Sequence, residues 1–151
     1  MNRFFAATRI AVLLLVVALV ASGCGLLNQS SGSGTATQGA QLGRIVTAES
    51  IDTTRNNAPV NETNTFSQEQ RAIYAVVEAQ RIDPNTTMFA RWSRDGQPFE
   101  DSQEIKADKQ YQNTYVEFHL EPTNKAIDPG NYTVQVFVNG NPAKQANFTV
   151  Q

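Results

Sequence analysis

The sequence predicts an all-β domain, a single two-sheet antiparallel β-sandwich of about seven short strands. Three observations predict this fold class. Apolar and polar residues alternate with a period of two along several short segments, and Gly, Pro, Asn and Asp separate these segments. No segment carries a convincing helical stripe of apolar residues longer than about ten residues. A chain of 151 residues has room for one such domain, which we place at residues 44–151.

The expected strands follow one another at short intervals. They lie at residues 45–50, 71–80, 87–94, 98–106, 114–121, 131–138 and 143–150. The segment 67–80 is ambiguous, because its Ala, Glu and Gln residues also favour a helix. Alternating, partly β-branched residues in its second half favour a strand there. The polar stretch 52–65 is expected to be a long loop or an extended crossing.

The clearest structural unit is a hairpin at the C-terminal end. The segment 132–138 alternates apolar and polar residues, and the segment 146–150 does the same on the other side of Asn139-Gly140. An Asn-Gly pair between two alternating runs is the strongest short signal for a β-hairpin. The predicted inward residues are Tyr132, Val134, Val136, Val138, Ala146, Phe148 and Val150.

Two further segments place apolar residues on one face. In TYVEFHLE the inward residues are Val116, Phe118 and Leu120, and in TMFARWSRDG they are Met88, Ala90 and Trp92. The second segment ends at Asp95-Gly96, which predicts a turn. Together with the C-terminal hairpin, these strands would bury one face against a second sheet.

The pattern resembles immunoglobulin-like and fibronectin type III sandwiches. Trp92 occupies what would be strand C, and the segment DPGNY at 128–132 looks like the tyrosine corner that begins strand F. No cysteine pair is available to link the two sheets, so the resemblance implies a core held by packing around Trp92, Phe118, Tyr132 and Phe148. An open β-barrel or a transthyretin-like sandwich would give much the same alternation.

The first 23 residues predict an export signal. Arg3 and Arg9 precede an uncharged apolar core at residues 10–20, which is too short for a membrane-spanning helix. The segment then resembles a bacterial lipoprotein signal peptide whose lipobox is ASGC at residues 21–24. The resemblance implies cleavage before Cys24 and acylation of its thiol, so that lipid is the partner of this only cysteine. The alternative is an ordinary signal peptide with an incidental thiol.

The predicted lipid anchor also predicts a location. The chain is expected in the cell envelope, on the outer membrane if the cell has one, because Gly25 follows the cysteine where an inner-membrane retention signal would have Asp. Residues 24–43 are expected to form the lipidated end and a flexible linker, since they are rich in Gly, Ser, Thr and Gln and carry no charge.

Groups suited to catalysis are scarce. The net charge of −2 without a basic block argues against nucleic acid as a partner. The only histidine, His119, is predicted to point outward between Glu117 and Glu121. The acidic residues of segment 99–108 do not follow a calcium-loop spacing, and zinc, phosphate-loop and dinucleotide motifs are absent from the sequence. We therefore expect no enzyme, no cofactor and no metal site.

Two outward faces are candidate binding surfaces. If the strands at 87–94 and 131–138 pair, the outward side chains of Phe89, Arg91, Gln135 and Phe137 lie together. Two aromatic residues and an arginine on one face are typical of contact sites. The other sheet offers a second candidate face made of Tyr74, Val76 and Tyr115. The alternative is that the segment 52–65 or a neighbouring edge covers one of these faces.

These observations favour a membrane-anchored lipoprotein whose domain binds an envelope protein or glycan without catalysis. A second hypothesis is a constitutive accessory subunit of a membrane complex. A third is a carbohydrate-binding module, which an exposed Trp92 or Tyr74 would favour and a buried Trp92 would disfavour. An esterase or peptidase is the least supported, since the sequence offers no recognisable nucleophile with its base.

Overall fold

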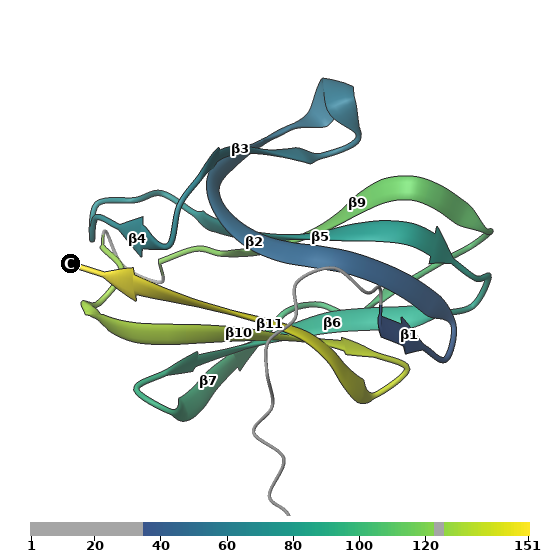
Figure 1. The fold of residues 1–151 in the computed structure, drawn as a ribbon. Helices are drawn as coiled ribbons and strands as arrows, with labels where there is room; N and C mark the ends of the chain where they lie inside the picture. The colour runs from purple at the N-terminus through teal and green to yellow at the C-terminus, as the bar shows by residue number, and fades with distance from the viewer. Residues whose placement is uncertain (1–34, 123–125) are drawn as a thin grey trace, which may run out of the picture.

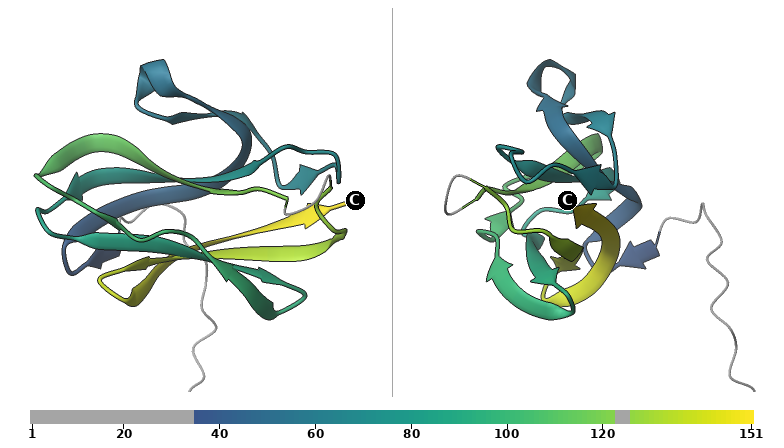
Figure 2. Two further views of the ribbon diagram at one scale, coloured as in Figure 1. Left: turned by 180° about the vertical axis from the view of Figure 1, so that it is seen from behind. Right: turned by 90° about the vertical axis from the view of Figure 1, so that its left-hand side faces the viewer.

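The computed structural model describes residues 35–122 and 126–151, which form two β-sheets packed face to face (Figure 1). The predicted export signal, Cys24 and residues 25–34 of the predicted linker lie outside these residues. Within the described part of the chain, no helix is long and apolar enough to cross a membrane. An end-on view shows the two layers and a hairpin that rises from one of them (Figure 2).

The first sheet, called sheet A, has the strand order β1-β2-β5-β9, and β3 pairs with part of β2. All of its pairings are antiparallel. Its strands are β1 (Thr35–Thr37), β2 (Ala40–Asp52), β3 (Ala58–Glu62), β5 (Ile73–Ile82) and β9 (Tyr111–Leu120).

The second sheet, called sheet B, has the strand order β4-β11-β10-β6-β7, and β8 pairs with the other end of β6. Only the two-residue strand β4 runs parallel to its neighbour, β11. Its strands are β4 (Thr65–Phe66), β6 (Thr87–Arg94), β7 (Gln97–Asp101), β8 (Ile105–Lys106), β10 (Gly130–Val138) and β11 (Asn141–Val150).

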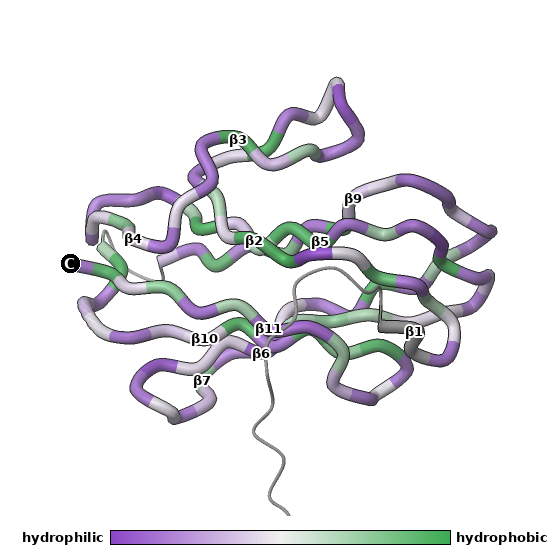
Figure 3. Tube along the Cα trace, viewed as in Figure 1, coloured by the Kyte–Doolittle hydropathy of each residue, from purple (hydrophilic) through white to green (hydrophobic). Residues whose placement is uncertain are grey.

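The core lies between the sheets and is built from alternate residues of the long strands. Figure 3 shows hydrophobic and hydrophilic positions alternating along them. Trp92 is fully buried there, and the ring of Phe148 packs edge-on against it with ring centroids 6.1 Å apart. Most of the predicted inward residues are buried; Ala146 is half-buried and packs against the core. The period-two alternation therefore identified the buried face of β6, β9, β10 and β11 correctly.

The predicted turns and the tyrosine corner are confirmed. Asn139-Gly140 joins β10 to β11 and Asp95-Gly96 joins β6 to β7, and all four residues have positive φ, as a two-residue hairpin turn of this type requires. The Tyr132 hydroxyl donates a hydrogen bond to the carbonyl oxygen of Asp128 at 2.7 Å. Strands β6 and β10 therefore end at the turns that the sequence predicted.

The predicted linker boundary at Gly43 is wrong, because the ordered domain starts earlier. Ala40 and Leu42, both within the predicted linker, are buried in the core. The turn before β2 is fixed by its neighbours: the Thr86 hydroxyl donates to the carbonyl oxygen of Gly39 at 2.8 Å. The Asn139 amide donates to the carbonyl oxygen of Gln38 at 2.8 Å. Small residues that resemble a linker here serve close packing.

The polar stretch 52–65 also differs from the expectation of a loop or crossing. It contains β3, which pairs back onto the end of β2 to form the β2–β3 hairpin, residues 48–62. Figures 1 and 2 show this hairpin rising over the outer face of sheet A. Asn56 and Asn57 have positive φ at its tip, which lets the chain reverse there.

Candidate functional site

The first predicted face forms on the outer side of sheet B. Strands β6 and β10 are antiparallel neighbours, and their register places Gln135 opposite Arg91 and Phe137 opposite Phe89. Because side chains alternate across a strand, all four point away from the core, whose sides of β6 and β10 are buried. The four side chains are half-buried. The structure therefore brings together the whole set that the sequence predicted, here called the aromatic face.

The centre of the aromatic face is a pair of parallel rings. Phe89 and Phe137 stack with centroids 4.6 Å apart and an interplanar angle of 2°. The guanidinium carbon of Arg91 lies 5.4 Å from the Phe137 centroid and 5.9 Å from the Phe89 centroid. Cross-strand aromatic pairs and cation–π contacts each contribute about 0.5–1 kcal/mol in such half-exposed settings. The three side chains thus hold one another in place before any partner arrives.

Asp101 belongs to this face, and the sequence reasoning missed it. Its carboxylate accepts two hydrogen bonds from Arg91, from Nε and from Nη2, each at 2.7 Å. These bonds raise the pKa of Arg91 and lower the pKa of Asp101. The strand β7 carries Asp101 to this position beside β6. The guanidinium is therefore already paired. The face presents a neutral Arg91–Asp101 ion pair and two aromatic rings, and no unpaired positive charge from Arg91.

The rim of the aromatic face comes from β11. A bulge between Val136 and Phe137 places Pro142 opposite Phe137. The Gln135 amide donates a hydrogen bond to the carbonyl oxygen of Lys144 at 3.0 Å. Proline has no N–H group to satisfy, so Pro142 adds apolar surface beside the rings. The result is a shallow face made of rings, a proline and amide groups.

The second predicted face does not form as an open surface. Val76 is buried with 1% of its surface exposed, although it points away from the core. The β2–β3 hairpin lies over this side, and Arg44 fastens it with two hydrogen bonds to Glu62 and one to Glu78, all at 2.7–2.8 Å. Tyr74 and Tyr115 remain half-buried. The sequence left open that the segment 52–65 covers one of the two faces. In the structure this segment covers part of the outer face of sheet A.

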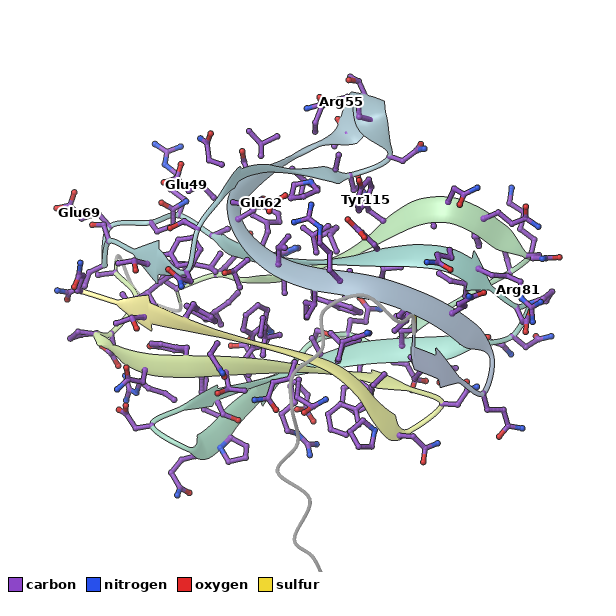
Figure 4. All side chains as sticks on the ribbon, viewed as in Figure 1. Glu49, Arg55, Glu62, Glu69, Arg81 and Tyr115 are labelled. Carbon is purple, nitrogen blue, oxygen red and sulfur yellow. The ribbon has the colours of Figure 1, made fainter. Side chains whose placement is uncertain are left out.

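Tyr115 lies between β9 and the hairpin (Figure 4), where it lines a hollow together with residues of the hairpin tip. The ring of Tyr74 lies 5.7 Å from that of His119. His119 is exposed, and its Nδ1 lies 3.2 Å from a carboxylate oxygen of Glu117. The outward position of His119 between its two glutamates is as predicted.

In residues 35–122 and 126–151, no three His, Cys, Asp or Glu side chains are arranged to hold a metal ion. Trp92 is fully buried, which counts against the carbohydrate-binding module that the sequence left open. The aromatic face is thus the best-formed candidate site among the predicted residues.

Sequence reasoning also missed a second surface. On one flank of the sandwich β2 and β11 contact each other, and this surface lies on the other flank. Phe99, Ile105 and Tyr111 are the exposed large hydrophobic side chains of the described chain. They come from β7, β8 and β9, the outermost strands of the two sheets on that side. The segments around these residues are short and charged. They show no alternation of apolar and polar residues from which exposed apolar side chains could be predicted.

Comparison with known proteins bears on the fold. No family model matches the sequence, and no curated protein matches it. Among solved structures, the chain is similar to an immunoglobulin-like protein, PA1606, from Pseudomonas aeruginosa. The superposition has a TM-score of 0.50 and 13% sequence identity, and it covers 76% of this chain and 100% of that chain.

A second similarity is to the alkylpurine DNA glycosylase AlkC of Pseudomonas fluorescens, bound to DNA with an abasic site analogue. Its TM-score is 0.35 at 18% identity, over 58% of this chain and 27% of that chain, and it carries no argument about this chain. The first superposition, the sheet order and the tyrosine corner agree with one another. The described domain has an immunoglobulin-like fold.

Proposed function

We propose that this chain is a lipid-anchored envelope protein whose immunoglobulin-like domain binds another envelope protein through the aromatic face, without catalysis. The observation that carries the proposal is the Phe89–Phe137 stack with Arg91 over it, on an outer sheet face that no other described element covers. Aromatic residues and arginine are enriched among the residues that dominate protein–protein binding.

The preorganisation of this face supports a binding role. Asp101 fixes the guanidinium of Arg91, and the two rings fix each other, so little side-chain freedom would be lost when a partner binds. The ion pair also neutralises Arg91, so a phosphate or carboxylate of a partner would have to compete with Asp101. Contacts to apolar and amide groups of a protein suit this surface better than recognition of an anion.

A protein partner fits the rings better than a glycan does. Sugars stack on the free face of an exposed aromatic ring, whereas each of these rings covers one face of the other. Trp92, the largest aromatic side chain of the domain, is buried and offers no platform. Glycan binding is therefore an outcome for the test to detect and is not proposed.

The anchor part of the proposal rests on the lipobox ASGC and Cys24. Residues 25–34 separate Cys24 from β1, and a fully extended chain of that length spans at most about 35 Å. Acylation with two or more chains would hold the domain stably near the bilayer. The partner would then be another component at the same membrane surface or within this distance of it.

The experiment is photo-crosslinking in the host cell with the full chain. A photoreactive phenylalanine analogue replaces Phe89, and the matched control carries it at Glu69, an exposed position outside the aromatic face. We expect one dominant protein adduct from position 89 and none from position 69. The adduct should disappear when Phe137→Ala is added, because this change removes the stacked ring.

Several results would overturn the proposal. These are no adduct from position 89, an adduct that persists with Phe137→Ala, or enrichment of glycan in place of protein. Loss of membrane association in Cys24→Ala, measured by cell fractionation, tests the anchor separately. If Cys24→Ala stays in the membrane fraction, the lipid anchor is wrong whatever the aromatic face binds.

A constitutive accessory subunit would use the same face, and stoichiometry distinguishes it from a reversible binder. A subunit should co-purify with one complex at a fixed ratio through dilution, while a binder of ordinary affinity should dissociate. The polar groups of the aromatic face, Gln135 and the pair of Arg91 with Asp101, favour the reversible binder, because obligate interfaces are more apolar.

A further inference from the structure

The two long flanks of the sandwich differ in how their edges are closed. On one flank β2 and β11 contact each other, and the short strands β1 and β4 pair with their ends. On the other flank β9 is the last strand of sheet A, and β7 and β8 are the last strands of sheet B. This second flank, made of β7, β8 and β9, is called the open edge. A strand at such an edge keeps unpaired backbone groups on its outer side.

The open edge carries the exposed large hydrophobic residues of the described chain. Phe99 on β7 is 51% exposed, Ile105 on β8 is 44% exposed, and Tyr111 on β9 is 36% exposed. Phe99 packs edge-on against Tyr132, with centroids 6.0 Å apart, which holds its ring at the surface. Ile105 and Tyr111 lie at one end of the open edge and Phe99 at the other, so exposed apolar side chains mark both ends of it as candidate contact points.

Two hollows lie along the open edge, between β9 and the facing strands of sheet B, and the tip of the β2–β3 hairpin also lines one of them. The first has a volume of about 560 Å³, and its buried apolar lining is Ile82, Met88 and Val116. The second has a volume of about 540 Å³, and its lining includes Phe99, Leu120 and Ile127. They flank β9 near its two ends. Apolar side chains spaced along one extended chain could enter both.

Strands β7 and β9 of the open edge differ in their protection against pairing with a further strand. Strand β7 carries Pro98, Glu100 and Asp101, and proline and charged residues prevent a further strand from adding to an edge. Strand β9 has no proline and a single acidic residue, Glu117, and its regular part follows Asn113, whose φ is positive. Of the two, β9 is therefore the strand to which another strand can add.

The charge around the open edge is mainly negative. Arg94 is paired with Asp128, and Lys106 is the other basic residue that lines the hollows. The acidic side chains that line them are Asp95, Glu100, Glu117, Glu121 and Asp128. A partner with basic side chains would complement this surface, whereas an acidic partner would be repelled.

We propose that β9 accepts an extended strand from another protein, with apolar residues at alternate positions that enter the hollows and Lys or Arg residues between them. Backbone hydrogen bonds to β9 would supply affinity, and the hollows and acidic rim would supply specificity. The site is separate from the aromatic face and does not depend on it. A second copy of this chain fits less well, because a two-fold contact brings the same acidic groups opposite one another.

The test uses the full chain in detergent and synthetic peptides about eight residues long, the length of an ordinary strand. One peptide alternates Val with Lys, a second alternates Val with Glu, and a third has the first peptide's composition in scrambled order. We expect the Val-Lys peptide to bind at least about tenfold more tightly than either of the others, measured by fluorescence anisotropy. Amide protection from hydrogen exchange should increase in residues 112–120.

Two variants locate the site. Ile105→Lys adds a positive charge beside the first hollow and should weaken binding of the Val-Lys peptide about tenfold. Phe89→Ala, on the aromatic face, should leave it unchanged. Equal binding of the basic and acidic peptides, or protection outside β9, would overturn the proposal. So would sedimentation of the chain as a dimer that Ile105→Lys dissociates, since that result assigns the edge to a second copy.

Discussion

The outer faces of the two sheets have the same alternating sequence pattern but differ in how far their outward side chains are buried. On sheet A the β2–β3 hairpin folds over the strands, and the outward-pointing residues Val76 and Ala48 are 1% and 0% exposed. On sheet B no described element lies over the aromatic face, and its residues are half-buried by one another and by their neighbours on β7 and β11. Each face has an arginine in a bidentate pair with a carboxylate, Arg44 with Glu62 and Arg91 with Asp101.

The two ion pairs do different work because of what each connects. Arg44 joins three strands, since it bonds to β3 through Glu62 and to β5 through Glu78, so it holds the cover in place. Arg91 bonds to the neighbouring strand β7 and lies over two rings on the uncovered face. An arginine thus holds the β2–β3 hairpin in place on sheet A, and another arginine forms part of the exposed aromatic face on sheet B. An outward position in a strand does not by itself mean an exposed side chain.

The largest expected difference between the faces concerns a buried charge. We expect Val76→Asp to lower the free energy of unfolding by about 3 kcal/mol or more, because the carboxylate would lie beneath the hairpin without a partner. The matched change on sheet B is Ser93→Asp, at a half-buried outward position, and should cost about 1 kcal/mol or less. Urea denaturation of both variants measures the two values. Equal losses would mean that the hairpin does not cover Val76 in solution.

The second difference concerns the two arginines and is expected to be local. Arg44→Ala should raise hydrogen exchange in β3 about fivefold, because the hairpin loses its fastening while the sandwich beneath remains folded. Arg91→Ala should leave exchange in β3 unchanged. Hydrogen-exchange mass spectrometry reports both. If Arg44→Ala unfolds the whole domain instead, the hairpin is part of the cooperative core and is not a separate cover.

Much of the sandwich could be predicted because the long strands alternate strictly. Trp92, Val134 and Phe118 lie on the core side as expected, and the paired outward positions Phe89 and Phe137 follow from the pairing of their strands. The register between β6 and β10 is what brings the rings together. Once those two strands are neighbours, the aromatic face follows from the period of two.

The rest could not be predicted because it depends on contacts that leave no periodic trace. Strand β3 contains Pro59 and Asn61, whose φ is positive, and strand β4 is two residues long. The start of the domain was hidden because Gly39 and Gly43 give a linker-like composition. Gly39 is in fact required for close packing, since a Cβ there would lie 2.7 Å from Thr86 and Asn139 side-chain atoms.

A third expected difference depends on pH. The Arg44 hydrogen bonds lower the pKa of Glu62, and hydrogen bonds from Thr54 and then Arg55 lower the pKa of Asp52 to about 2. Both carboxyls have lower pKa values in the closed hairpin than in an open chain, so their contribution is complete above about pH 5 and is lost as the pH falls toward 2. Hydrogen-exchange protection in β3, corrected for the intrinsic rate, should therefore fall in this range before protection in β10 does.

The control for the pH dependence is Glu62→Gln. This variant keeps the shape of the side chain but removes the titrating group, so its β3 protection should be lower at pH 6 and less dependent on pH below it. A pH profile identical to that of the unchanged protein would show that Glu62 does not hold the hairpin. Arg91 also lowers the pKa of Asp101, but Asp101 lies on sheet B, so protection in β3 should not report its protonation.

The smallest effect is expected at His119, which lies at the edge of the region that the β2–β3 hairpin covers on sheet A. His119 lies on the same outer face as Val76, two strands away from β2, yet its side chain is 47% exposed. Its ring contacts Tyr74, Glu117 and Glu121. His119→Ala should therefore change the free energy of unfolding by no more than about 0.5 kcal/mol at pH 7, in urea denaturation. A larger loss would mean that the hairpin, whose tip lies beside Tyr115, covers β9 as far as His119. The covered region would then include the edge to which we assign an added strand, and peptide binding at β9 would have to displace the hairpin first.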